Sequence, residues 1–147
     1  MPTRTARTAW NGSLTDGSGT VELVSSGTGT FDVSFPRRAA ESADGVTSPE
    51  ELIAAAHSSC YSMALAAEVG ALGGTAEQVE VTAEVSLGDD PNGGHRITSS
   101  VLTVKGFAAG LDEAAFRQAA EAAKIGCPVS KALGTVDEIV LQLDYEH

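Results

Sequence analysis

The first third of the chain alternates between apolar and polar residues in short runs, which is typical of β-strands separated by turns. Phe31, Val33 and Phe35 fall on one face of the third run, and Pro36 ends it. We interpret the three runs as an antiparallel meander, followed by a loop over 39–47. The predicted strands cover 3–10, 19–25 and 28–35.

The pattern then changes to a long helix over 48–72 that carries almost no charge. Ser48 has the character of an N-cap, Pro49 suits the first helical position, and Glu51 follows three residues after the cap. Gly73 and Gly74 end the helix. Small and apolar residues cover most of its circumference, which predicts a helix buried on nearly all sides. Cys60 lies at its centre, on one stripe with Ile53, Ala56, Met63, Ala64 and Ala67.

The second half predicts a β-hairpin, two helices and a last strand. The strand over 78–87 alternates strictly and returns, through a loop at 89–94, as the strand over 97–107. Helices over 112–124 and 129–133 precede a strand over 139–145. This order predicts an α+β fold with antiparallel sheets around the long helix, in one domain over 1–147. Six short strands and one modest helix are too few to cover that long helix on every side. We therefore expect a homodimer in which both chains enclose it.

Composition narrows the functional classes. The 147 residues are 42% hydrophobic and 20% charged, as in an ordinary soluble protein. The net charge of -11 argues against nucleic acid and against anionic membrane surfaces as partners. No apolar segment follows Arg4 and Arg7, so no signal peptide is visible and we expect a cytoplasmic protein. Its two cysteines are then expected to be reduced thiols.

The two cysteines differ in their local settings. Cys127 precedes Pro128 at a predicted helix start, where the helix dipole lowers a thiol pKa. Cys60 lies far beyond the first turn of its helix, and burial raises the pKa of such a thiol. A reactive Cys60 therefore needs a cation from elsewhere, and Arg37 and Arg38 are the candidates. The alternative is that both arginines point to water from a loop.

Two acidic residues begin the long helix. Glu51 fits a capping box, which leaves Glu50 without a capping role. Glu50 precedes Cys60 by ten residues, or about 15 Å along a helix axis, so it cannot touch Cys60 of its own helix. If the two belong to one site, Glu50 acts through an arginine or comes from a partner chain.

Other chemistries have weaker support. His57 lies one turn before Cys60, but no third group is apparent to orient its ring, and a satisfied structural histidine is the favoured interpretation. The three histidines and two cysteines form no spaced ligand pair, so we expect neither a metal nor a cofactor.

Two segments resemble a known family. Ser-Pro-Glu-Glu-Leu-Ile-Ala-Ala-Ala-His-Ser-Ser-Cys-Tyr-Ser-Met-Ala-Leu and Ala-Lys-Ile-Gly-Cys-Pro-Val-Ser are similar to the two cysteine motifs of the OsmC/Ohr family of organic hydroperoxide reductases. The order and spacing of the predicted elements agree along nearly the whole chain. Met63 and His57 place the resemblance on the OsmC branch.

The resemblance implies a homodimer that reduces organic hydroperoxides with thiols at two interfacial sites. Cys60 matches the peroxidatic cysteine, Cys127 the resolving cysteine and Glu50 the acidic residue. The family arginine follows a strand as Phe-x-x-Arg, which selects Arg38, with Arg37 as the alternative because the following loop looks long. Arg38 is then expected to provide the cation for Cys60, with partner chains sharing each site. A Cys60–Cys127 disulfide would be reduced by a dithiol, for which a dihydrolipoyl group is a candidate.

Two other functions remain open from the sequence. One is a non-enzymatic redox-sensing or small-ligand-binding protein on the same scaffold, with the cysteines as a switch. The other is a structural role in which both thiols are buried and inert.

Overall fold

The computed structural model describes residues 1–146. The chain divides into two compact units, Met1–Leu52 and Ile53–His147. The α+β class predicted from the sequence is confirmed, with three strands in each unit. The single domain over 1–147 stays a prediction. None of the described helices is long and apolar enough to cross a membrane.

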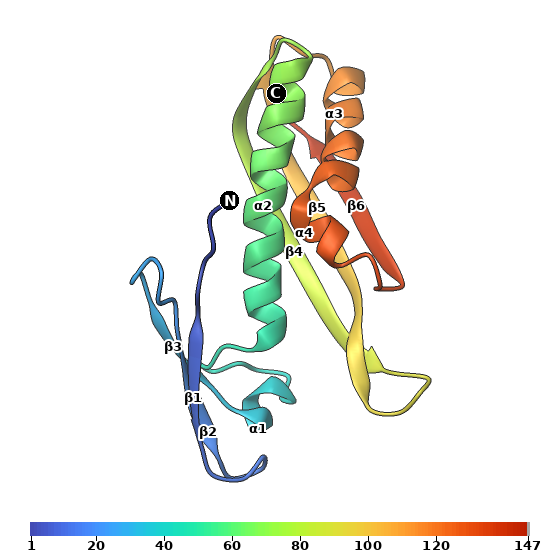
Figure 1. The fold of residues 1–147 in the computed structure, drawn as a ribbon. Helices are drawn as coiled ribbons and strands as arrows, with labels where there is room; N and C mark the ends of the chain where they lie inside the picture. Colours follow the sequence, from blue (N-terminus) through green and yellow to red (C-terminus); the bar gives the residue numbers. More distant parts are fainter. Residues whose placement is uncertain (147) are drawn as a thin grey trace. The chain divides into compact units, whose positions relative to one another are not determined.

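The Met1–Leu52 unit is built on the predicted antiparallel meander. Its strands pair in the order β1-β2-β3 (Figure 1). The third is shorter than predicted, because the chain turns into the short helix α1. Ser34 caps this helix and Pro36 fits its first turn, which explains why a sequence read as a strand end becomes helical. The elements are β1 (Arg7–Asn11), β2 (Ser18–Glu22), β3 (Thr30–Val33) and α1 (Phe35–Arg38).

The long helix α2 (Pro49–Ala71) begins in the first unit and continues in the second. As predicted, Ser48 is its N-cap: the Ser48 Oγ accepts a hydrogen bond of 3.2 Å from the backbone N–H of Glu51. Gly73 follows the helix with a φ of 84°, a left-handed conformation that ends helices at little cost for glycine.

Burial along α2 differs from the prediction. One stripe with a spacing of four is buried: His57, Tyr61, Leu65 and Val69. The expected stripe around Cys60 is not the buried one, since Met63 is 73% exposed and Ala56 and Ala67 are exposed too. The side of the helix that carries Ala56, Met63 and Ala67 is uncovered in this single chain, and its enclosure by a second chain stays a prediction.

The Ile53–His147 unit contains a mixed sheet in the order β4-β5-β6. The predicted hairpin of β4 (Thr75–Asp89) and β5 (His95–Ala109) is confirmed, and both strands are longer than predicted. The expectation of purely antiparallel sheets is wrong at one pair, because β6 (Glu138–Tyr145) runs parallel to β5. The helices α3 (Glu113–Gly126) and α4 (Pro128–Ala132) lie between these strands in the chain, and such a crossover returns the next strand in the same direction.

The core of this unit lies between its helices and its sheet (Figure 1). Tyr61 of α2 donates a hydrogen bond of 2.8 Å from its hydroxyl to the carbonyl of Ala120 in α3, which fixes the two helices together. Cys127 is a member of the buried cluster, and Cys60 packs against it. The cluster consists of Tyr61, Leu65, Val69, Leu102, Val104, Ala108, Phe116, Ala119, Ala120, Ala123 and Cys127.

Candidate functional site

The Ile53–His147 unit brings the two cysteines together from positions 67 residues apart. Cys60 lies in the middle of α2, and Cys127 joins the end of α3 to the start of α4. Both thiols are free, and they lie close enough for each to shift the pKa of the other. Cys127 is completely buried, whereas Cys60 is partly accessible. The arrangement can support a thiol pair that closes into a disulfide.

The surroundings of the two sulfur atoms separate their pKa values. Burial raises the pKa of Cys60, and the backbone N–H of Val129 offsets this only in part. Burial acts on Cys127 in the same direction, but the backbone N–H of Ser130 and the Cys60 thiol outweigh it, so its pKa is lowered. Within this unit the negative charge is therefore favoured on Cys127, and Cys60 requires a further cation to ionise.

His57 is a fully buried ring with both nitrogen atoms satisfied. Its Nδ1 lies 2.7 Å from the Ser100 Oγ of β5, and its Nε2 lies 2.8 Å from the Ser130 Oγ of α4. Burial lowers the pKa of the ring, so the imidazole is neutral near pH 7. These two hydrogen bonds confirm the interpretation of His57 as a structural histidine with both ring nitrogen atoms hydrogen-bonded. Its position is explained without a catalytic pair between Cys60 and His57.

The Met1–Leu52 unit holds the other two candidate residues, Arg38 and Glu50. The guanidinium of Arg38 donates hydrogen bonds to the carboxylate of Glu50. Its Nη2 lies 2.6 Å from Oε1, and its Nε lies 3.1 Å and 3.2 Å from Oε1 and Oε2. The Glu50 side chain is 12% exposed and that of Arg38 is 32% exposed. Burial by itself raises the pKa of Glu50, but the hydrogen bonds and charge of Arg38 lower it below its ordinary value.

The neighbouring Arg37 makes a different ion pair. It joins Asp44 in the loop after α1, and both side chains are largely exposed. Neither arginine therefore simply points to water. Of the two candidates, Arg38 is the one joined to Glu50, while Arg37 has a partner that the sequence did not single out.

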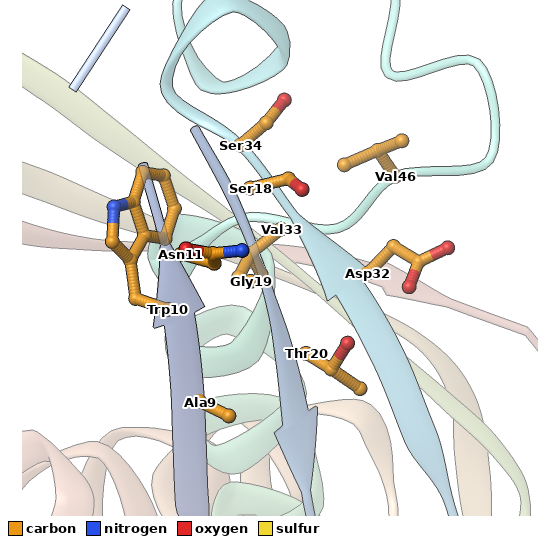
Figure 2. Close-up of a pocket in the computed structure, with 10 residues that line it drawn as sticks. All are labelled: Ala9, Trp10, Asn11, Ser18, Gly19, Thr20, Asp32, Val33, Ser34 and Val46. Atoms are coloured by element: carbon orange, nitrogen blue, oxygen red, sulfur yellow. The ribbon is translucent and has the colours of Figure 1, made fainter. Parts of the chain in front are cut away.

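Two open cavities flank the sheet of this first unit. One, of about 550 Å³, lies over polar side chains that include Asn11, Ser18 and Asp32 (Figure 2). The other, of about 440 Å³, is mainly apolar, and Arg38 is the charged residue in its lining. Its apolar wall consists of Ala6, Trp10, Leu14, Val21, Val33, Phe35, Pro49 and Leu52.

Ser100 and Ser130 were not predicted as partners of the buried histidine. Ser130 is the third residue after Cys127, the N-cap of α4, and a polar residue at this position often contacts the N-cap. The sequence therefore contains a weak signal that Ser130 has a structural role. Nothing distinguishes Ser100 from its serine and threonine neighbours. Among residues 1–146, no group of three or more histidine, cysteine, aspartate or glutamate side chains is placed to hold a metal ion.

Comparison with known proteins decides the family. A model of the family described as OsmC-like protein matches residues 42–141. Peroxiredoxin OsmC of Escherichia coli K12 is 38% identical over 137 residues, which span 93% of this chain and 91% of that protein. The chain belongs to the OsmC-like family. The resemblance found in the sequence is confirmed.

Solved structures agree with this membership. An organic hydroperoxide resistance protein OsmC from Legionella pneumophila aligns with a TM-score of 0.74 at 26% identity, over 100% of this chain and 98% of that one. The organic hydroperoxide resistance protein OhrB of Bacillus subtilis aligns with a TM-score of 0.69 at 28% identity, over 97% and 98% of the two chains. The OsmC-like fold of this chain therefore extends over its whole length.

Proposed function

We propose that this OsmC-like protein is a thiol-dependent peroxidase that reduces organic hydroperoxides to alcohols. The observation that carries the proposal is the packing of the free thiol Cys60 against the buried cluster that contains the second free thiol, Cys127. A sulfenic acid formed on either cysteine would lie close to the thiol of the other. The names of the relatives, a peroxiredoxin and two organic hydroperoxide resistance proteins, support a peroxidase-type role.

The reaction begins at Cys60, the partly accessible sulfur of the pair. Its thiolate attacks the distal oxygen of ROOH and the O–O bond breaks. The alkoxide takes a proton from solvent and leaves as ROH, and Cys60 becomes a sulfenic acid. Cys127 then attacks the Cys60 sulfur, so that a disulfide forms and hydroxide leaves as water after protonation. A dithiol, such as a dihydrolipoyl group, restores both thiols by exchange.

Arg38 supplies the cation that Cys60 needs in this proposal. An arginine keeps its charge at every physiological pH, and Glu50 fixes the orientation of the guanidinium. Two chains share each site in a homodimer, with Arg38 and Glu50 as one half and the two cysteines as the other. The uncovered side of α2, where Met63 and Ala67 are exposed, supports a second chain as its cover.

The apolar cavity beside Arg38 supports an organic rather than an inorganic peroxide as substrate. Its wall suits an alkyl or aryl group, while the guanidinium suits the peroxide oxygens. Leu14 lines this cavity and is 61% exposed, so its replacement should not unfold the unit. We expect Leu14→Ser to reduce kcat/KM for cumene hydroperoxide more than for hydrogen peroxide. An equal effect on both substrates would mean that this cavity does not bind the organic group of the hydroperoxide.

Anaerobic titration of the reduced protein with cumene hydroperoxide tests the function itself. We expect one equivalent to be consumed per chain, with a Cys60–Cys127 disulfide identified by mass spectrometry and reversed by dithiothreitol. Cys60→Ser should abolish turnover, and Cys127→Ser should allow one oxidation and then stall. Turnover that survives Cys60→Ser would refute the assignment. Slow, substoichiometric oxidation that no dithiol reverses would instead favour a redox sensor. We also propose that this protein acts in the cytoplasm.

A further inference from the structure

One large side chain of α2 lies beside the accessible edge of Cys60. Cys60 is partly buried against the core, and the adjoining side of the helix carries the exposed residues Ala56, Met63 and Ala67. Met63 is 73% exposed. Residues three positions apart on a helix are neighbours on its surface, with Cβ atoms about 5–6 Å apart. A hydroperoxide that approaches Cys60 from this side therefore passes the thioether of Met63.

The side chains around Met63 offer a peroxide no other oxidisable group. They are small, and the hydroxyls of Ser59 and Ser62 donate hydrogen bonds of 2.7 and 2.8 Å to backbone carbonyls of the preceding turn. The sulfur of Cys127 belongs to a completely buried residue. Within the described part of α2, Met63 is therefore the oxidisable residue that a peroxide can reach besides Cys60. The exposed residues of α2 between positions 53 and 70 are Ala55, Ala56, Ser59, Met63, Ala66, Ala67 and Gly70.

A thioether and a hydroperoxide react without a third reagent. The sulfur attacks the distal oxygen of ROOH, an S–O bond forms and the O–O bond breaks. The proton of that oxygen passes to the departing alkoxide, which leaves as ROH, and methionine sulfoxide remains. The sulfur is oxidised by two electrons and the peroxide is reduced by the same two.

We infer that Met63 is a second site of oxidation by hydroperoxides: a hydroperoxide held beside Cys60 transfers its distal oxygen to the Met63 thioether when Cys60 cannot react with it. The inference rests on the proposed function, because the oxidant is the substrate that Cys60 would reduce. In the proposed homodimer a second chain covers this side of α2, so Met63 borders the route of the substrate to Cys60. Proximity to the bound peroxide makes Met63 react faster than a methionine in solution. Its sulfoxide replaces an apolar neighbour of Cys60 by a polar one.

The test measures methionine sulfoxide in a protein without thiols. Full-length protein with Cys60→Ser and Cys127→Ser is incubated with cumene hydroperoxide, and N-acetylmethionine amide in the same solution provides the rate of an unhindered thioether. Mass spectrometry of the peptides follows the gain of one oxygen. We expect Met63 to be oxidised about tenfold faster than the free compound. An excess of cumyl alcohol, the product of the reaction, should slow the oxidation of Met63 and leave that of the free compound unchanged.

Two further variants are the controls. Met63→Leu in the same background removes the thioether and identifies its peptide signal. Leu72→Met places a second thioether nine residues after Met63, about 14 Å further along the helix direction, at a position that is 40% exposed. The methionine at 72 should react no faster than the free compound, because it lies away from Cys60.

The outcomes separate this inference from the proposed function. Oxidation of Met63 at the rate of the free compound, or at a rate that cumyl alcohol does not change, overturns the inference and leaves the peroxidase intact. If the variant without thiols does not fold, wild-type protein whose thiols have already reacted with hydroperoxide gives the same comparison. Wild-type thiols that never react with hydroperoxide refute the peroxidase. Fast oxidation of Met63 that cumyl alcohol slows would still support a hydroperoxide site beside Cys60.

Discussion

Glu50→Gln isolates the contribution of the Arg38–Glu50 ion pair, because it removes the charge of the carboxylate and keeps its shape. Glu50 is 12% exposed and accepts three N–H···O contacts of 2.6, 3.1 and 3.2 Å from one guanidinium. The amide presents one oxygen where the carboxylate presented two, so the guanidinium loses part of its paired hydrogen bonding and a half-buried N–H group loses its partner.

The magnitude follows from this geometry. A hydrogen bond to a charged group contributes about 1.5–3 kcal/mol. Since the Arg38 side chain is 32% exposed, water replaces part of that contribution, and we expect Glu50→Gln to lower the free energy of unfolding by about 1–2 kcal/mol. The pair Arg37–Asp44 is the matched control. Its side chains are 43% and 55% exposed, so Asp44→Asn should cost no more than about 0.5 kcal/mol.

Urea unfolding followed by tryptophan fluorescence measures both variants. The chain has one tryptophan, Trp10, and it lies on β1 in the same unit as both ion pairs. In the peroxidase assay, Glu50→Gln should lower kcat/KM for cumene hydroperoxide about tenfold, because the guanidinium loses the group that orients it. Equal losses of stability and activity in Glu50→Gln and Asp44→Asn would refute the choice of Arg38 over Arg37.

Three further predictions concern the second unit. Burial lowers the pKa of His57 from 6.5, so below that pH the unfolded chain binds a proton that the folded chain does not. The free energy of unfolding, measured with urea, should therefore be highest above pH 6.5 and fall as the pH drops below it. His57→Gln should make this fall less steep. Leu65→Ala should cost about 2–5 kcal/mol in chemical unfolding, because Leu65 is completely buried, whereas Leu72→Ala, 40% exposed near the end of α2, should cost less than about 1 kcal/mol. Gly106→Ala should lower the melting temperature, with a loss of about 2 kcal/mol, because φ is 141° and a new Cβ would lie 2.6 Å from the Gln78 carbonyl oxygen; an unchanged melting temperature would contradict this.

The elements with strong local signals could be predicted from the sequence. The helix expected over 48–72 is observed as Pro49–Ala71, since its cap and its terminal glycines are local features. The hairpin of β4 and β5 follows from the strict alternation over 78–87 and the turn-rich loop after it. The helix α1 was missed, because Phe35 reads as the end of an alternating strand and the capping by Ser34 becomes visible only in the folded chain.

Long-range relations could not be predicted in the same way. The direction of β6 depends on how α3 and α4 cross the sheet, which no local pattern states. The partners of His57 lie 43 and 73 residues away, so no local pattern joins them. The family resemblance paired Cys60 with Cys127, whereas spacing alone left them unrelated, and in the structure Cys60 packs against the buried cluster that contains Cys127.

Cys60 has the accessible thiol and Cys127 the thiol with the lowered pKa, and this difference explains why the proposed reaction at Cys60 needs a cation. Cys60 is the thiol that a substrate can reach, but burial raises its pKa. Cys127 has the lowered pKa and no exposed surface. In the reaction that we propose, a peroxide would meet a protonated sulfur unless a positive charge stabilised the Cys60 thiolate. A lysine would serve poorly because its own pKa falls on burial. An arginine held by a carboxylate keeps its charge and its direction, and Arg38 with Glu50 has this arrangement. In the reaction that we propose, the lowered pKa of Cys127 would favour the second step, in which a thiolate attacks the sulfenic acid on Cys60.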